Sequence, residues 1–330
     1  MNELIKKLVE AYGPSGFEDG LRDLIRPEIE AYADEIRVDA LGNLIATKKG
    51  DGSGLKVMIA AHMDEIGVMA THITKEGFLR FTNIGGVLPH NLMGSRVQFA
   101  NGVIGVIGSD RIDDRGKIHP LNKHYIDVGA SSPEDCPVAV GDAAGFVRPF
   151  QSQGSRLTSK AMDDRIGCAV AIETLKRLHS TPHEVHFAFT VQEEVGIRGA
   201  TTAANHLDPD VGIALDVTLT GDMPEARPMA ISLGKGAAIK VKDSGMIAHA
   251  GLVRLMKQRA EAANIPYQLE VLDGGTTDAR SMQIANGGVA AGCISIPCRY
   301  VHSQSETVDA NDVESCVRLL IEILANPITY

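Results

Sequence analysis

The sequence of 330 residues lacks several features that would point to common classes of protein. It contains no tryptophan and only 4% aromatic residues, which argues against a surface that stacks sugars. No apolar run approaches the roughly 20 residues that a membrane-spanning helix needs. The five cysteines are an odd number without C-x-x-C spacing, so neither a disulfide framework nor a cysteine zinc cluster is indicated. We therefore expect a reducing, cytoplasmic setting.

The charge of the chain excludes a further class of partner. The formal net charge is −10, so no basic stripe is available to neutralise the phosphates of a nucleic acid. The first seven residues predict an amphipathic helix and not a secretory signal. A hydrophobic content of 44% and a charged content of 22% are typical of a soluble globular protein. The length suits one large α/β domain or two domains.

The order of expected elements indicates an α/β fold interrupted by an insertion. A helix near residues 2–12 precedes Gly13-Pro14, and a capping-box spacing at Ser15–Glu18 predicts a second helix to about residue 34. Strands are expected at residues 36–40, 44–47 and 55–61, the last of them buried on both faces. Residues 70–157 instead show short β-like runs separated by turn residues. We therefore predict a catalytic domain of residues 1–69 and 158–330, with an inserted β-rich domain of residues 70–157.

Helices and strands alternate again from residue 163 to the C-terminus, which predicts a mixed sheet covered by helices on both faces. The expected helices lie at residues 165–178, 200–206, 252–263 and 311–325, with another starting at residue 278. The expected strands lie at residues 187–192, 211–216, 230–241, 267–272 and 289–296.

Two adjacent acids, Glu193 and Glu194, end an apolar strand and precede Gly196. Successive side chains of a strand point to opposite faces, so two neighbouring carboxylates cannot easily serve one purpose. We therefore expect the two glutamates to have different roles. One glutamate would bind a ligand and the other would react. An isolated Glu-Glu pair also fits a solvated acidic turn.

Other strands and loops carry further candidate metal ligands. His62 and Asp64 follow the strand at 55–61, and Asp216 ends the strand at 211–216. Asp163 precedes a helix and His302 follows a strand. In open α/β sheets ligands bind at the carboxyl ends of the strands, so these side chains are placed to converge. Taken singly, Asp163 fits a helix cap, Asp216 a turn and His302 an exposed loop.

The type of these residues selects the chemistry. Two histidines with three carboxylates and no cysteine suit zinc, cobalt or manganese. Five ligands exceed one tetrahedral catalytic site, but they suffice for two ions about 3.5–4 Å apart when one carboxylate bridges them. Water held by such ions is a nucleophile at neutral pH if a nearby base takes its second proton.

The motifs around these residues resemble those of the M42 tetrahedral aminopeptidases, a family of two-metal peptidases that includes glutamyl, leucyl, lysyl and deblocking enzymes. The resemblance extends over essentially the whole chain. It rests on segments that stand in the family's order, namely Tyr12–Glu18, Ala61–Gly67, Asp163–Gly167, Val191–Gly196, Gly274–Ala279 and Ile296–Ser303.

The resemblance implies a role for each candidate residue. It makes Glu193 the general base, and Asp64 the partner that orients the His62 imidazole. It suggests a cis peptide bond between Asp163 and Asp164. Asp278 would help to bind substrate, or would only cap the next helix. Arg299 and Tyr300 would shape the pocket, or would only stand at its rim. The implied metal ligands are His62, Asp163, Glu194, Asp216 and His302, with Asp163 bridging the His62–Asp216 ion and the Glu194–His302 ion.

The implied protein is an aminopeptidase that binds two divalent metal ions per subunit, zinc or cobalt with manganese as the alternative. It acts on peptides with a free N-terminus. The inserted domain would be PDZ-like and would assemble the chain into hollow homododecamers, with neither nucleic acid nor membrane as a partner. Three alternatives stay open: a deacylase of N-acyl amino acids, an endoglucanase-like homologue and an inactive assembly subunit. The preferred N-terminal residue is not predicted.

Overall fold

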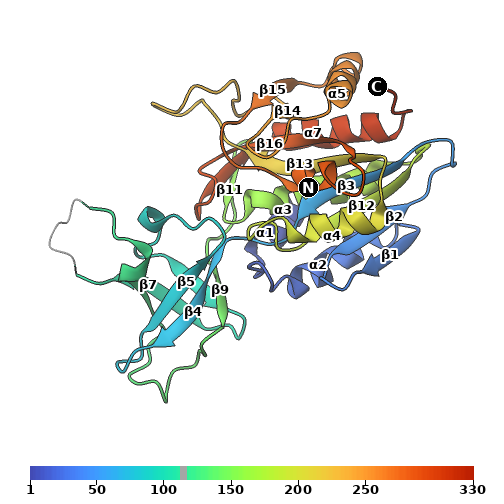
Figure 1. Ribbon diagram of the computed structural model, residues 1–330. Coiled ribbons are helices and arrows are strands. Elements are labelled where there is room, and N and C mark those ends of the chain that lie inside the picture. The colour runs from blue at the N-terminus through green and yellow to red at the C-terminus, as the bar shows by residue number, and fades with distance from the viewer. Residues whose placement is uncertain (112–116) are drawn as a thin grey trace.

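The computed structural model describes residues 1–111 and 117–330, which form a large α/β body and a smaller β body (Figure 1). The β body comprises strands between residues 67 and 146, and it projects away from the helices in Figure 1. Within the described part of the chain, no helix is long and apolar enough to cross a membrane.

A mixed sheet of eleven strands forms the centre of the large body. Four neighbouring strands, in the order β12-β3-β13-β16, are parallel, and the outer strands mostly run antiparallel. The eleven strands are β1 (Glu35–Val38), β2 (Leu44–Lys48), β3 (Lys56–His62), β10 (Gln151–Gln153), β11 (Arg156–Ser159), β12 (Glu184–Thr190), β13 (Val211–Thr218), β14 (Ala237–Lys242), β15 (Tyr267–Val271), β16 (Ala290–Arg299) and β17 (Glu306–Asp309).

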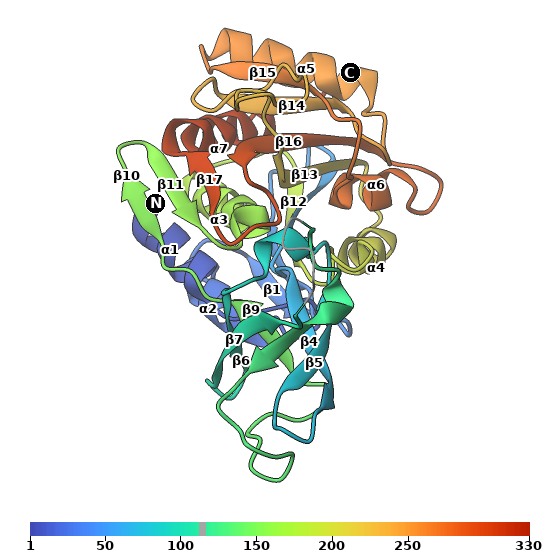
Figure 2. The same cartoon turned by 90° about the vertical axis from the view of Figure 1, so that its left-hand side faces the viewer.

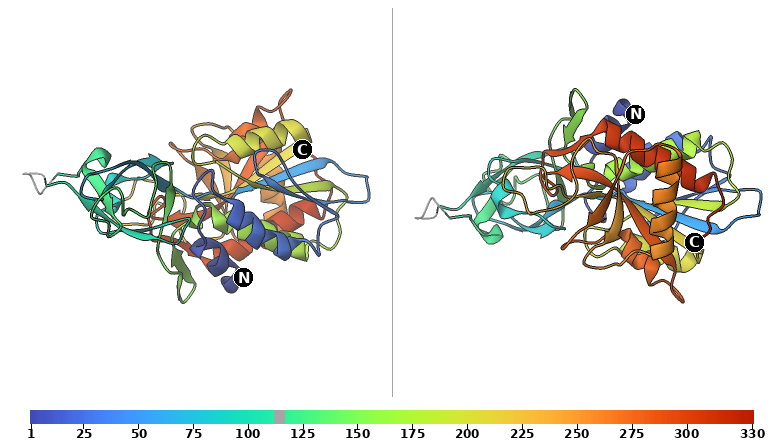
Figure 3. Two further views of the ribbon diagram at one scale, coloured as in Figure 1. Left: turned by 90° about the horizontal axis from the view of Figure 1, so that it is seen from below. Right: turned by 90° about the horizontal axis from the view of Figure 1, so that it is seen from above.

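Helices cover both faces of this sheet because its central strands are apolar on both sides. On β3, Ile59 and Ala61 pack into one core, whereas Met58 and Ala60 pack into the other. Figures 2 and 3 show α4 on the opposite side of the sheet from α1 and α3. The helices are α1 (Asn2–Glu10), α2 (Asp19–Ile29), α3 (Met162–Arg177), α4 (Arg198–Leu207), α5 (Ala250–Ala262), α6 (Asp278–Gln283) and α7 (Ala310–Leu324). The expected mixed α/β fold is confirmed.

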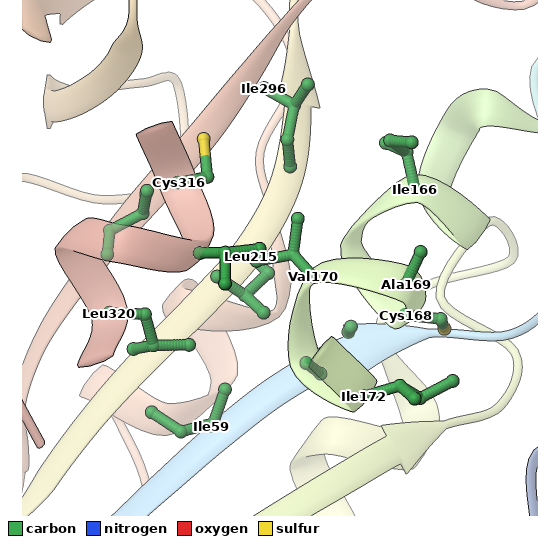
Figure 4. Close-up of a cluster of buried hydrophobic side chains, with 14 of the residues drawn as sticks. Ile59, Ile166, Cys168, Ala169, Val170, Ile172, Leu215, Ile296, Cys316 and Leu320 are labelled. Atoms are coloured by element: carbon green, nitrogen blue, oxygen red, sulfur yellow. The ribbon is translucent and has the colours of Figure 1, made fainter. Parts of the chain in front are cut away.

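Helix α3 supplies much of the larger core. Every residue from Met162 to Ile172 is buried, so this part of the helix is enclosed on all sides and not on one face alone. Figure 4 shows Val170 of α3 beside Leu215 of β13, and α3 also contacts β3. The helix therefore rests directly on the strands that end at the candidate metal ligands.

Replacing Ile172 with alanine is expected to destabilise the fold by about 2–5 kcal/mol, because the side chain is fully buried and its loss leaves a cavity. Urea unfolding of the purified protein would measure the difference. Ile247→Ala is the matched control, since Ile247 is 69% exposed and its truncation should change stability by less than about 0.5 kcal/mol. Equal effects of the two substitutions would contradict the described packing.

The smaller body is a closed barrel with the strand order β4-β5-β8-β7-β6-β9. Its core includes Val68, Leu79, Phe99, Ile126 and Phe146. The resemblance predicts a PDZ-like fold for this segment, and the structure shows a six-stranded barrel. The strands are β4 (Gly67–Ile73), β5 (Leu79–Ile84), β6 (Arg96–Phe99), β7 (Ile104–Ser109), β8 (His124–Asp127) and β9 (Ala143–Phe146), with short 3₁₀ turns η1 (Pro89–Asn91) and η2 (Leu121–Lys123).

The expected capping box at the start of the second helix is wrong. Helix α2 begins at Asp19 without a side-chain cap. The Ser15 hydroxyl donates to Asp64 instead, at 2.6 Å, and the Glu18 carboxylate accepts from the amides of Gly16 and Gln192. Both side chains of the apparent motif therefore have partners outside the helix.

Candidate metal centre

The five predicted metal ligands and Glu193 line one cavity of about 600 Å³. His62 ends β3, and Glu193 and Glu194 follow β12, which pairs with β3 in parallel so that Thr190 stands opposite His62. Because these parallel strands end at one edge of the sheet, their terminal residues meet there. The other three predicted ligands reach the cavity from β13, from the start of α3 and from the loop after β16, as Asp216, Asp163 and His302.

Asp163 stands between the two histidines. Its Oδ1 lies 3.1 Å from His62 Nε2, and its Oδ2 lies 3.4 Å from His302 Nε2. His302 Nε2 is also 3.3 Å from Glu194 Oε2. One carboxylate thus directs a different oxygen toward each imidazole, which is the arrangement that a carboxylate bridging two metal ions requires.

Two groups of three side chains bring their donor atoms within 4.8 Å of one another. One group is His62, Asp163 and Glu194, and the other contains His62 and Asp216 together with Asp164. The sequence did not single out Asp164 as a ligand. The Asp164 carboxylate accepts from the amides of His62 and Gly167, both at 3.2 Å, so it already has main-chain partners. The peptide bond from Asp163 to Asp164 is cis, as the resemblance suggested.

The cavity holds more acids than its histidines can neutralise. Burial raises the pKa of Glu193 well above its usual range, with His62 opposing the rise and Asp216 adding to it. Burial, followed by the Asp163 charge, likewise raises the pKa of Asp216. For His302, burial lowers the pKa, but Asp163 and Glu194 outweigh it and raise the pKa to about 12. Buried carboxylates in such excess are stabilised by cations, and the mixed imidazole and carboxylate donors fit divalent metal ions.

Glu193 lies beside the ligands, with its Oε2 3.9 Å from His62 Nε2. Its side chain is 13% exposed, so it is held in the wall of the cavity and still faces the space where substrate would lie. A carboxylate held beside a reacting water can accept a proton from it and pass the proton to a leaving group. The position suits a general base.

Asp64 has more partners than the sequence suggested. Its Oδ1 lies 3.5 Å from His62 Nδ1, while the main-chain oxygen of Asp64 is closer to the same nitrogen, at 3.1 Å. The two carboxylate oxygens accept the amides of Glu193 at 2.9 Å and Glu194 at 3.1 Å. Asp64 therefore fixes the backbone that carries both glutamates as well as facing the imidazole.

Glu306 and Glu65 are supporting residues that sequence reasoning missed. Glu306 accepts the amides of His302 at 2.8 Å and of Asp163 at 3.0 Å, so one carboxylate positions two predicted ligands. Glu65 pairs with Lys160 at 2.6 Å and Arg165 at 3.0 Å. Glu65 lies inside the motif Ala61–Gly67, and Glu306 lies three residues after the motif Ile296–Ser303. This proximity was the available signal.

Asp278, Arg299 and Tyr300 were expected to play smaller parts at the site, and the structure places them differently. Asp278 is buried and accepts the Thr190 hydroxyl at 2.6 Å, while Thr277 caps α6. Arg299 pairs with Asp222 at 2.8 Å, and Tyr300 is 53% exposed. Neither Arg299 nor Tyr300 lines the cavity, although the neighbouring Val301 and His302 do.

The barrel reaches the site through Gly85 and Gly86, which follow β5. A Cβ atom on Gly86 would lie 2.3 Å from His302 Nδ1, and one on Gly85 would lie 3.0 Å from Glu194 Cβ. Gly85 also has a positive φ of 71°, which favours glycine. Leu88 lines the same cavity. The wall of the site is therefore built partly by the barrel.

Comparison with known proteins relates the whole chain to one family. The model of the M42 glutamyl aminopeptidase family matches residues 42–319. The lysyl aminopeptidase of Pyrococcus furiosus is 39% identical, over 98% of this chain and 96% of its own length.

Two solved structures extend the comparison to the fold. A TET1 peptidase of Pyrococcus horikoshii, described as assembling into a tetrahedron or a large octahedral shell, is 36% identical with a TM-score of 0.89, covering 98% of both chains. A Thermotoga maritima protein described as an endoglucanase is 34% identical with a TM-score of 0.83, covering 97% of this chain and 96% of its own.

Proposed function

Since this chain belongs to the M42 glutamyl aminopeptidase family and is a hydrolase of peptide bonds, we propose that it removes N-terminal residues with two divalent metal ions bound in the described cavity. The observation that carries the two-ion proposal is the placement of Asp163. Its two oxygens face two different histidines, at 3.1 Å and 3.4 Å.

We assign the donor atoms to two sets that share Asp163. His62 and Asp216 would hold one ion with it, while Glu194 and His302 would hold the other. Imidazole and carboxylate donors suit zinc or cobalt, and manganese is also compatible. When bound, such ions polarise the scissile carbonyl, engage the free α-amine and lower the pKa of water.

The protein's own groups would move the proton. Glu193, beside His62, would accept a proton from the attacking water and give it to the departing amine. Asp64 would keep Glu193 and Glu194 in place through their amides. Glu306 would do the same for Asp163 and His302.

Treatment with EDTA is expected to abolish release of amino acids from peptides, and added zinc or cobalt should restore it. Peptides with a free N-terminus should be cleaved, whereas their acetylated forms should resist by at least about tenfold, because the α-amine is a binding group. Liquid chromatography of the products measures both rates.

The same assay separates the remaining alternatives. Faster cleavage of N-acyl amino acids than of free peptides would favour the deacylase. Release of sugars from a glucan, unaffected by EDTA, would favour the endoglucanase, a reaction for which a glycosidase needs two carboxylates flanking the bond. Absence of any hydrolysis with metal present would favour the inactive assembly subunit.

We also propose that the segment 70–157 acts as the PDZ-like assembly domain of the family and that the chain forms a homododecamer. A solved TET1 structure described as a dodecamer supports this proposal, as does the TET1 peptidase that can assemble into a tetrahedron. The five cysteines are all free, which supports a reducing, cytoplasmic setting.

A further inference from the structure

The loop after β12 carries Glu193 and is held by side chains from distant parts of the sequence. Because β12 ends at Thr190, the next four main-chain amides lie beyond the strand, and each donates to a side-chain oxygen at 2.9–3.1 Å. These bonds join Val191 to Asn43, Gln192 to Glu18, Glu193 to Asp64 Oδ1 and Glu194 to Asp64 Oδ2. All three acceptor side chains are buried. The path of the backbone at Glu193 therefore depends on them.

Gln192 is a strained position in this loop. Its φ of 56° lies in the left-handed region, which costs free energy for any residue with a side chain and persists only where the surroundings hold it. Glu18 provides such a hold through the Gln192 amide. The same carboxylate oxygen accepts the Gly16 amide at 2.7 Å, so the acceptor is itself fixed. Because Gln192 directly precedes Glu193, a change in its backbone conformation would turn the Glu193 side chain.

Glu18 belongs to a short segment that is tied to the end of β3 as well as to this loop. The Ser15 hydroxyl donates to Asp64 Oδ2 at 2.6 Å. The Ser15 amide donates to the main-chain oxygen of Glu65 at 3.3 Å, and the Gly13 amide donates to Glu65 Oε1 at 3.2 Å. The segment from Gly13 to Glu18 therefore links the residues that follow β3 to the loop that follows β12.

We propose that Glu18 is a positioning residue, which holds Gln192 in its left-handed conformation so that Glu193 faces the cavity. The inference rests on the proposed function, in which Glu193 moves the proton. Glu18 is not among the residues that line the cavity in the described part of the chain, so it acts only through the loop. Glu194 would also be fixed by its metal ion, whereas Glu193 would bind none. Loss of Glu18 should therefore impair the proton transfer and leave the metal ions in place.

The test measures kcat, KM and metal content of the metal-loaded full chain, with the aminoacyl p-nitroanilide that the wild type cleaves fastest. Glu18→Ala should lower kcat by about 10–10²-fold, the effect of misplacing a catalytic group by about 1 Å. KM should stay within about twofold and both ions should stay bound. Glu18→Gln should restore kcat to within about threefold, because its amide oxygen can accept the same two main-chain amides. Glu10→Ala is the matched control, since Glu10 also accepts a distant main-chain amide, that of Phe150 at 2.9 Å, and should leave kcat unchanged.

A double variant separates positioning of Glu193 from a general loosening of the structure. In Glu193→Gln the base is already lost, so adding Glu18→Ala should lower the residual kcat by less than about twofold. Equal losses in both backgrounds overturn the proposal, and so do an unchanged kcat or a lost metal ion in folded Glu18→Ala, or a Glu18→Gln variant that stays slow. If circular dichroism shows Glu18→Ala unfolded, Glu18→Asp takes its place in the same comparisons, because its shorter side chain withdraws the acceptor from the Gln192 amide. A wild type that hydrolyses no peptide or aminoacyl substrate, or a near-normal Glu193→Gln, contradicts the proposed function instead.

Discussion

Replacing Glu193 with glutamine is expected to lower kcat by about 10²–10⁴-fold, the usual contribution of general acid–base catalysis, without loss of either metal ion. Glutamine has nearly the same size and shape as glutamate, so the cavity should keep its form. Its amide cannot take a proton from water. The side chain lies 3.9 Å from His62 but directs no atom between the two histidines as Asp163 does, so metal binding should survive.

Steady-state kinetics with a leucyl substrate and metal analysis of the same sample measure both parts of this prediction. Glu184→Gln is the matched control, because Glu184 lies at the other end of β12 and its side chain is 46% exposed. Near-normal kcat in Glu193→Gln would remove Glu193 as the base. A loss of bound metal would show instead that Glu193 is a ligand.

Replacing Asp163 with alanine is expected to remove both metal ions and, with them, activity. Each of its oxygens faces one histidine, so a single substitution takes a donor from both candidate sites. Asp216→Ala should remove only one ion, because in the proposed assignment Asp216 would hold only the ion that His62 and Asp163 hold. Metal content per chain after gel filtration should therefore fall from about two toward zero in the first variant and toward one in the second.

The control for this series is Asp23→Ala on the exposed side of α2, which should retain both ions. Circular dichroism distinguishes metal loss from unfolding. Full occupancy in folded Asp163→Ala would show that Asp163 is not a ligand. Loss of a single ion would show that it does not bridge.

Much of the fold is predictable from periodicity, because long apolar elements bury whole faces. The helix expected at residues 311–325 spans Ala310–Leu324, and the one at 252–263 spans Ala250–Ala262. The β segment expected at 230–241 is less well predicted, since β14 covers Ala237–Lys242. Its start depends on pairing with β15 and β16, which no local pattern records.

Local motifs failed where distant partners claim the same side chains. Ser15 and Glu18 have the spacing of a capping box, but Asp64 and the Gln192 amide bind them. A side chain that bonds to a residue far along the chain makes as many hydrogen bonds as one that caps its own helix. Sequence spacing alone does not distinguish the two outcomes.

The location of the candidate site was predictable from the sequence, but the residues that hold its ligands in place were not. Strand ends that meet at one edge of a parallel sheet identified His62, Glu193 and Asp216 as neighbours. The placement of Glu306 beneath Asp163 and His302 was not predictable, because it depends on how the loop after β16 folds back. The metal ligands' individual roles stay predictions.

The two glycines that follow β5, Gly85 and Gly86, limit how the barrel can be exchanged. Gly86 brings the backbone after β5 so close to His302 that a Cβ atom would collide with the imidazole, and a Cβ atom on Gly85 would stand in tight contact with Glu194. A chimaera carrying a barrel from another protein must therefore keep glycine at position 86, because a side chain there would displace His302. The barrel is therefore not an interchangeable part, because the segment after β5 forms part of the cavity wall.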